Sequence, residues 1–128
     1  MANARICLVD DDHFVRDALA LGLTDAGFDV VSAPGAAAGF DIALRQPIDA
    51  VVTDMNMPGT SGAQFITEAR AAWPAMPIIV ISGASETDGR PTADVARELG
   101  ADATLLKPFR AYVLAALLKD LLKKRADG

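Results

Sequence analysis

The stretch ICLVDDD, residues 6–12, joins a short apolar run directly to three consecutive aspartates near the start of the chain. An apolar run without polar alternation is typical of a parallel strand that helices cover on both faces. Three like charges at the end of such a strand repel one another, and each carboxylate raises the pKa of its neighbours unless a cation lies among them. The stretch therefore predicts a buried strand with a cation site at its carboxyl end.

Four more apolar runs follow along the chain, and segments with apolar residues every three to four positions separate them. The run at residues 29–33 is the most polar of the five, which favours a place for it at the edge of a sheet. Strands that alternate with helices are typical of a parallel sheet between two helix layers. We therefore expect a three-layer, doubly wound α/β fold with a five-stranded parallel sheet. The expected strands are residues 5–9, 29–33, 50–53, 78–82 and 103–106, and the expected helices are residues 14–26, 35–45, 62–73, 92–99 and 110–125.

The length and composition indicate one acidic domain over residues 1–128, with a core over about 5–122 and a short charged tail at 123–128. The formal charge of −5 argues against nucleic acid as a partner, because that binding relies on basic patches. No stretch approaches the roughly 18 apolar residues that span a bilayer, so we expect a soluble, cytoplasmic protein without membrane contact. The single cysteine, Cys7, lies inside an apolar run and is expected to be a core residue.

Polar residues with complementary chemistry follow the expected strands. In an open parallel sheet, ligands bind beyond the carboxyl ends of the strands. Carboxylates, one carbonyl and waters are typical Mg²⁺ ligands, while an ammonium and a hydroxyl suit phosphoryl oxygens. The pattern therefore predicts a rim where a carboxylate attacks phosphorus. In strand order, the residues are Asp10, Asp11 and Asp12; Asp54 and Asn56; Ser82; and Lys107 with Pro108.

Four motifs in a fixed order, LVDDD, VVTDMNMPGTSG, IVISG and LLKPF, resemble the receiver domain of response regulators, the phosphoacceptor module of bacterial two-component signalling. The resemblance runs from about residue 5 to about residue 122. It implies a flavodoxin-like fold with strand order 2-1-3-4-5. It also implies that the donor is the phosphohistidine of a histidine kinase or histidine phosphotransferase. The cofactor would be Mg²⁺, with Mn²⁺ as a possible substitute.

The resemblance also implies which residues hold the metal. Asp54 matches the phosphoacceptor, and Asp10 and Asp11 match the acidic pair of the family. Asp11 and Asp54 would bind the metal directly, and Asp10 would act mainly through water. Asn56 would contribute its backbone carbonyl.

The remaining site residues come from the later two motifs. Ser82 would bind one phosphoryl oxygen and Lys107 would pair with another, and the bond before Pro108 would be cis. Such a domain is not a conventional enzyme. It catalyses its own phosphorylation and slow dephosphorylation, and its output is phosphorylation-dependent binding of a partner.

Three further positions bear on the conformational switch and on the lifetime of the phosphoryl group. Many receivers carry an aromatic residue three positions before the lysine, and here the residue is Thr104, so an aromatic switch is in doubt. Asn56 and Ala84 occupy positions that in this family modulate attack by water, and the small Ala84 favours a phosphoryl lifetime of minutes rather than hours. The polar segment at residues 83–94 predicts a mobile loop before a short fourth helix.

Other residues near the first strand have simpler explanations. Asp12 is expected to cap the first helix rather than to bind metal. The one histidine, His13, is expected to have no functional role. Phe14 and Leu21 lie on one flank of the first helix, and either they dock on a partner that carries the donor histidine or they widen the core face.

Alternative functions remain open at the level of sequence. A pseudo-receiver would dock to partners with little phosphotransfer. An aspartate-nucleophile phosphatase of the haloacid-dehalogenase type usually needs a second aspartate two residues after the nucleophile, and here that residue is Asn56. Met1 lies a few residues before the first expected strand, which favours a stand-alone regulator over part of a longer protein. The downstream target is unknown, and both a monomer and a phosphorylation-dependent dimer are compatible with the chain.

Overall fold

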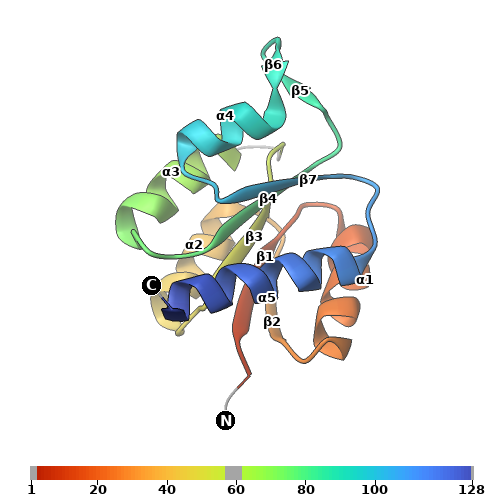
Figure 1. The fold of residues 1–128 in the computed structure, drawn as a ribbon, viewed down its shortest axis with the longest axis vertical. Coiled ribbons are helices and arrows are strands. Elements are labelled where there is room, and N and C mark those ends of the chain that lie inside the picture. The colour runs from red at the N-terminus through yellow and green to blue at the C-terminus, as the bar shows by residue number, and fades with distance from the viewer. Residues whose placement is uncertain (1–2, 57–61, 128) are drawn as a thin grey trace.

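The computed structural model describes residues 3–56 and 62–127 and contains the predicted five-stranded parallel sheet. The strand order is β2-β1-β3-β4-β7, which is the predicted order 2-1-3-4-5 with a small hairpin, β5-β6, inserted before the last strand (Figure 1). Residues 57–61 of the second motif lie outside the described residues. The strands of the sheet are β1 (Arg5–Val9), β2 (Asp29–Ala33), β3 (Ala50–Asp54), β4 (Ile78–Ser82) and β7 (Ala103–Leu106).

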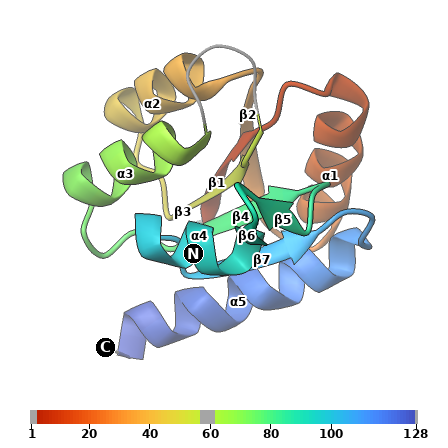
Figure 2. The ribbon, with the colours of Figure 1, turned by 90° about the horizontal axis from the view of Figure 1, so that it is seen from above.

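Helices cover both faces of the sheet, as the sequence pattern predicts (Figure 2). α1 and α5 pack on one face, and α2, α3 and α4 pack on the other. The predicted helix bounds agree with the structure to within two residues. The helices are α1 (His13–Asp25), α2 (Ala36–Arg45), α3 (Gly62–Ala72), α4 (Thr92–Leu99) and α5 (Ala111–Asp127). Within the described part of the chain, none of these helices is both long and apolar enough to cross a bilayer.

Two separate cores arise because successive side chains of a strand point to opposite faces. In β1, Ile6 and Leu8 pack against α1 and α5, whereas Cys7 and Val9 pack towards α2, α3 and α4. All four side chains are completely buried, and the burial of each of the three aliphatic ones contributes about 1.5–3 kcal/mol. Burial also raises the pKa of the Cys7 thiol to about 12, which fits the predicted core role of this residue.

The strand register brings two acidic positions to the same end of the sheet. Val9, the last residue of β1, pairs with Thr53 of β3. The residue after each of these is an aspartate, Asp10 or Asp54, and the Asp10 N–H still donates to the Ala33 carbonyl of β2 at 3.2 Å. The central strands therefore fix the backbone of both aspartates before any ligand binds.

The opposite end of the sheet is closed by two aspartates that precede strands. Asp49 precedes β3, and its Oδ2 accepts the N–H of Arg5 in β1 at 2.7 Å. Asp102 precedes β7, and its Oδ2 accepts the N–H of Ile78 in β4 at 2.8 Å as well as Arg70 Nη2 at 2.9 Å. We call these bonds the amino-end clamp, since they hold the first residues of adjacent strands together.

Asp12 lies outside the sheet and begins α1. Its Oδ1 accepts the backbone N–H groups of Phe14 at 3.0 Å and Val15 at 3.3 Å, which satisfies two of the free donors at the helix start. The predicted cap is therefore confirmed.

The sequence predicts a mobile loop at residues 83–94, after β4, but the structure has regular elements there. It contains a β-hairpin of β5 (Glu86–Thr87) and β6 (Arg90–Pro91), paired antiparallel. The turn residues Asp88 and Gly89 have φ values of 53° and 78°, and a two-residue turn with two positive φ angles matches the twist of a hairpin. Arg90 Nη1 and Nη2 then bond the carboxylate of Glu98 in α4 at 2.7 and 2.6 Å. The predicted short fourth helix is confirmed, with eight residues.

Gly62 allows α3 to begin directly against the end of β3. A Cβ at this position would lie 2.6 Å from the Asp54 carbonyl and would also contact the Met55 carbonyl, so the backbone has to shift. We expect Gly62→Ala to lower the free energy of unfolding by roughly 1–3 kcal/mol, measured by urea denaturation. Gly83→Ala is the matched control, because a Cβ at residue 83 would meet no atom within 4 Å, and it should change stability by less than about 0.5 kcal/mol. Equal stability of the two variants would contradict this explanation.

Candidate functional site

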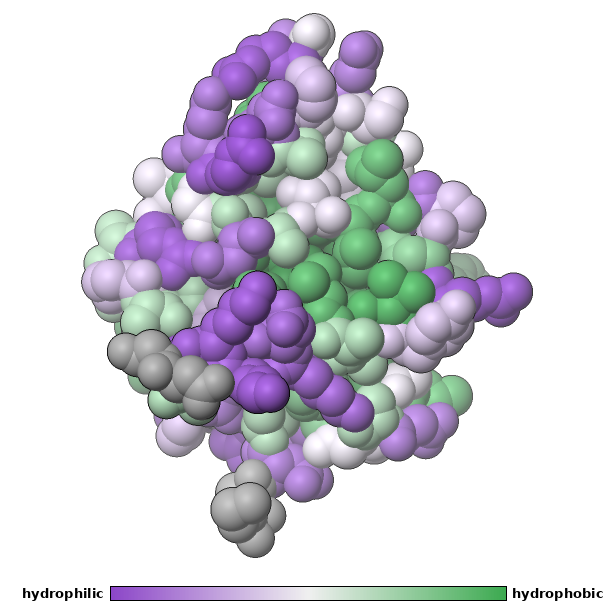
Figure 3. Space-filling model, in the orientation of Figure 1, coloured by the Kyte–Doolittle hydropathy of each residue, from purple (hydrophilic) through white to green (hydrophobic). Residues whose placement is uncertain are grey.

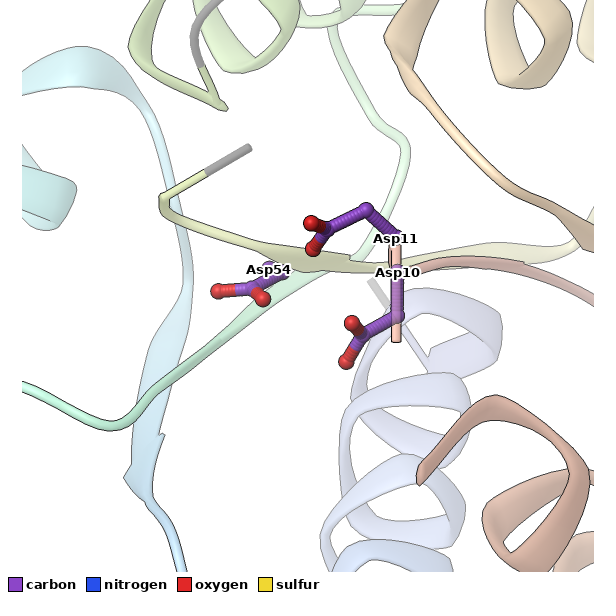
Figure 4. A group of neighbouring side chains, drawn as sticks. All are labelled: Asp10, Asp11 and Asp54. Carbon is purple, nitrogen blue, oxygen red and sulfur yellow. The ribbon is translucent and has the colours of Figure 1, made fainter. Parts of the chain in front are cut away.

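Three carboxylates meet at the carboxyl ends of β1 and β3, as predicted (Figure 4). Asp10, Asp11 and Asp54 each offer one oxygen atom, and these atoms all lie within 4.8 Å of one another. Asp10 is completely buried, Asp54 is 6% exposed, and Asp11 is exposed. The cluster thus has two fixed, buried members and one that faces solvent.

Lys107 supplies the positive charge at this cluster. Its Nζ lies 3.0 Å from Asp10 Oδ2 and 3.2 Å from Asp54 Oδ2, so one ammonium bridges the two buried carboxylates. Burial of Lys107 opposes its charge, but the hydrogen bond to Asp10 and the negative charges of both partners outweigh burial and raise the pKa of Lys107. The side chain therefore stays protonated at neutral pH. The peptide bond between Lys107 and Pro108 is cis, as the resemblance implies.

Asp54 is the carboxylate whose ionisation the fold opposes. Burial raises the pKa of Asp54, and the nearby charge of Asp10 acts in the same direction. The Asn56 N–H, which donates to Asp54 Oδ1 at 3.2 Å, and the Lys107 ammonium lower the pKa by less. The ionised carboxylate of Asp54 therefore has fewer stabilising contacts than it would have in water. A further cation beside it would stabilise the ionised form.

One backbone N–H and one arginine side chain bond Asp10 and hold it in place. The Asp12 N–H donates to Asp10 Oδ1 at 2.9 Å, and Arg16 Nη1 donates to the Asp10 carbonyl at 2.7 Å. Arg16 was missed as a site neighbour by sequence reasoning. It lies on α1, six residues after Asp10, and is partly buried, but nothing in the helical pattern distinguishes it from other arginines of the sequence.

Ser82 lies at the correct strand end but does not bond the carboxylates in this structure. It is completely buried, and its Oγ bonds the backbone of Ala84, accepting from the N–H and donating to the carbonyl, both at 3.0 Å. Thr104 pairs with Val80 across β7 and β4 and is partly buried. The structure thus brings together five of the predicted site residues, Asp10, Asp11, Asp54, Asn56 and Lys107, whereas the Ser82 hydroxyl bonds its own loop.

The donor set fits a hard divalent cation. Mg²⁺ binds oxygen ligands, prefers carboxylates and keeps several waters, and this cluster offers three carboxylates with one of them open to solvent. Among the described residues the cluster holds carboxylates alone, without the histidine or thiolate ligands that are most common in zinc sites. The Asn56 carbonyl stays a predicted ligand beside these three residues.

Comparison with known proteins identifies relatives over nearly the whole chain. A family model described as response regulator receiver domain matches residues 6–119. The transcriptional regulatory protein PrrA of Mycobacterium tuberculosis is 37% identical over 127 residues, covering 99% of this chain and 53% of PrrA. The chain thus spans about half the length of this curated relative.

Solved structures with the same fold include a response regulator receiver domain protein from Clostridium thermocellum. It is 28% identical, with a TM-score of 0.87, and the alignment covers 96% of this chain and 97% of that chain. A CheY-like receiver domain protein from Methanospirillum hungatei has a TM-score of 0.90, with 98% of each chain covered. Its identity is 24%, so this second likeness concerns the fold alone.

Proposed function

The chain belongs to the response regulator receiver domain family of two-component signalling, and from this membership we propose that Asp54 is its phosphoacceptor. The observation that carries the proposal is the bridge from Lys107 Nζ to Asp10 and Asp54, within a carboxylate cluster suited to Mg²⁺. The proposed donor is the phosphohistidine of a histidine kinase or histidine phosphotransferase. The proposed unit is one receiver domain over residues 1–128, acting in the cytoplasm on a protein target.

The transfer step begins with the ionised carboxylate of Asp54. One carboxylate oxygen forms a bond to phosphorus while the phosphorus–nitrogen bond of the donor breaks, and the electron pair of that bond stays on the imidazole. The raised pKa of Asp54 makes its carboxylate a better nucleophile than a freely hydrated aspartate once it is ionised. Mg²⁺, when bound, neutralises charge on the phosphoryl oxygens.

Lys107 and Ser82 act on the group that is transferred. Before transfer, the Lys107 ammonium pairs with Asp54 and Asp10. Once Asp54 is phosphorylated, the negative charge lies on the phosphoryl oxygens. The Lys107 ammonium then pairs with one of these oxygens. Ser82 donates to another phosphoryl oxygen after its hydroxyl leaves Ala84. Asn56 and Ala84 border the acyl phosphate and govern the approach of the water that hydrolyses it.

Intact mass after incubation with acetyl phosphate and Mg²⁺ tests the proposed function. The wild-type protein should gain about 80 Da, the mass of one phosphoryl group. The gain should disappear with time after the reagent is removed, since the domain dephosphorylates itself. A pseudo-receiver would show no gain, with or without a phosphohistidine donor. A phosphatase would release phosphate from many monoesters and would need an acid at the position of Asn56.

Asp11→Asn should weaken Mg²⁺ binding without disturbing the fold. Asp11 is exposed, whereas the other two carboxylates of the cluster are buried, so the substitution removes one metal ligand and little packing. We expect Mg²⁺ affinity to fall about 10- to 100-fold, measured by calorimetric titration, with the unfolding midpoint in a chelator unchanged. Asp12→Asn is the matched control, because Asp12 caps α1 and asparagine also caps. A similar loss of affinity in both variants would contradict the role of Asp11.

A further inference from the structure

The hydroxyl of Ser82 is occupied in the resting structure. A serine hydroxyl has one hydrogen to donate, and Ser82 directs it to the Ala84 carbonyl at 3.0 Å. The same oxygen accepts the Ala84 N–H at 3.0 Å. To donate to a phosphoryl group on Asp54, as the proposed function requires, Ser82 has to release the Ala84 carbonyl.

The Ala84 carbonyl has a second donor from the start of α4. Thr92 is completely buried, and its Oγ1 donates to the Ala84 carbonyl at 2.7 Å. Its N–H donates to the Ser85 carbonyl at 2.9 Å, which fixes the threonine against the loop. Thr87 Oγ1 lies 2.9 Å from Thr92 Oγ1, and because Thr92 has already directed its one hydrogen to Ala84, Thr87 is the donor of this pair.

The inserted hairpin holds Thr87 in this position. Thr87 is the last residue of β5, and the turn at Asp88 and Gly89 places it opposite Arg90 of β6. Arg90 in turn bonds Glu98 with both terminal nitrogens, which attaches the hairpin to α4. Figure 1 shows the hairpin standing at the beginning of α4, and Figure 3 shows a hydrophilic surface at the same end of the molecule. The hydroxyl chain from Thr87 to Ala84 thus rests on a defined element.

We propose that Thr92 is a positioning residue that permits Ser82 to leave the Ala84 carbonyl. The inference rests on the proposed function, because it concerns how Ser82 reaches the phosphoryl group. When Ser82 turns away, the carbonyl keeps the hydrogen bond from Thr92 and is not left without a donor in a partly buried place. Without the Thr92 hydroxyl, the carbonyl would keep no side-chain donor from the described residues once Ser82 leaves, and the resting arrangement of Ser82 would be favoured.

This arrangement would transmit a change at Asp54 to the surface around α4 without an aromatic residue at the position of Thr104. Movement of Ser82 changes the bonds of Ala84, and Ala84 is bonded to Thr92 at the first turn of α4. A phosphoryl group on Asp54 would change the affinity for a partner that binds the hairpin or α4. By reciprocity, that partner would change the affinity of the site for a phosphoryl mimic by the same factor.

Titration with beryllofluoride in the presence of Mg²⁺ tests the inference, because beryllofluoride bound to an aspartate mimics the phosphoryl group. Thr92→Val removes the hydroxyl and keeps the shape, and it should weaken beryllofluoride binding about three- to tenfold in calorimetry. Thr92→Ser keeps the hydroxyl and should bind within about twofold of the wild type. Thr92→Ala is a second variant without the hydroxyl, and the urea midpoint of each variant establishes that it is folded.

A double-mutant cycle with Ser82→Ala separates positioning from a purely structural effect. In the Ser82→Ala background no hydroxyl leaves the Ala84 carbonyl, so Thr92→Val should no longer change beryllofluoride affinity. Wild-type affinity of Thr92→Val, or equal weakening with and without Ser82, would overturn the inference while leaving Asp54 as the acceptor. Failure of the wild type to bind beryllofluoride in an Asp54-dependent manner would overturn the proposed function itself.

Discussion

Asp54→Asn protein, incubated with acetyl phosphate and Mg²⁺, is expected to keep its unmodified mass, whereas the wild type gains about 80 Da. An amide has no anionic oxygen to attack phosphorus, so the loss of labelling should be complete rather than partial. Asp10→Asn and Asp11→Asn are the informative comparisons, because each retains Asp54 and should still label at a reduced rate. Labelling of Asp54→Asn at the wild-type rate would place the acceptor elsewhere.

The same substitution should stabilise the protein when no divalent metal is present. Burial raises the pKa of Asp54, so the folded state favours the protonated carboxyl more than the unfolded chain does. The stability from this preference is complete below the ordinary aspartate pKa of about 3.9 and is lost as the pH rises through the raised pKa. At pH 7 in a chelator, Asp54→Asn should therefore unfold at higher urea than the wild type, and the difference should shrink towards pH 3. A less stable variant at pH 7 would contradict the cost of ionising Asp54.

Lys107→Met should slow phosphorylation by acetyl phosphate about 100-fold, a loss typical of removing one charged group that stabilises a transition state. The ammonium bridges Asp10 and Asp54 at 3.0 and 3.2 Å, and no replacement charge follows when methionine takes its place. The measurement is the initial rate of the mass gain at saturating Mg²⁺. Lys107→Arg is the control that keeps the charge, and it should retain more activity than Lys107→Met.

Metal binding distinguishes this effect from a general collapse of the site. Lys107 Nζ already bonds Oδ2 of Asp10 and Oδ2 of Asp54, so a metal ion that binds these oxygens would have to compete with the ammonium. Lys107→Met should therefore bind Mg²⁺ at least as tightly as the wild type, although it labels slowly. A phosphorylation rate within about threefold of the wild type would show that the ammonium is dispensable for transfer.

The sheet could be predicted from the sequence because the runs that form its three central strands, β1, β3 and β4, are apolar without polar alternation. β1, β2, β4 and β7 begin and end where the pattern places them, and β3 extends one residue further, to Asp54. Helix ends are harder to predict, because they depend on local capping. α1 begins at His13, one residue earlier than expected, because the side chain of the N-cap Asp12 accepts the first free N–H groups.

The hairpin and the orientation of the Ser82 side chain could not be predicted from the sequence, for two different reasons. The turn residues Asp88 and Gly89 are a standard hairpin signal, but the flanking strands have two residues each, too few for an alternating pattern to be recognised. The motif around Ser82 identifies the residue and not its rotamer. Arg16 reaches the Asp10 carbonyl through a long side chain, and such contacts depend on the tertiary structure.

The amino-end clamp has a consequence for the motions of the domain. Asp49 and Asp102 tie neighbouring strands together at the end of the sheet far from Asp54, whereas the other end carries the charged cluster and the loop in which Ser82 bonds Ala84. Amide hydrogens at Arg5 and Ile78 should consequently exchange with solvent only through global unfolding, while those around Ala84 exchange through local opening. We therefore expect the amino end of the sheet to stay closed while the carboxyl end, near Ala84, opens locally.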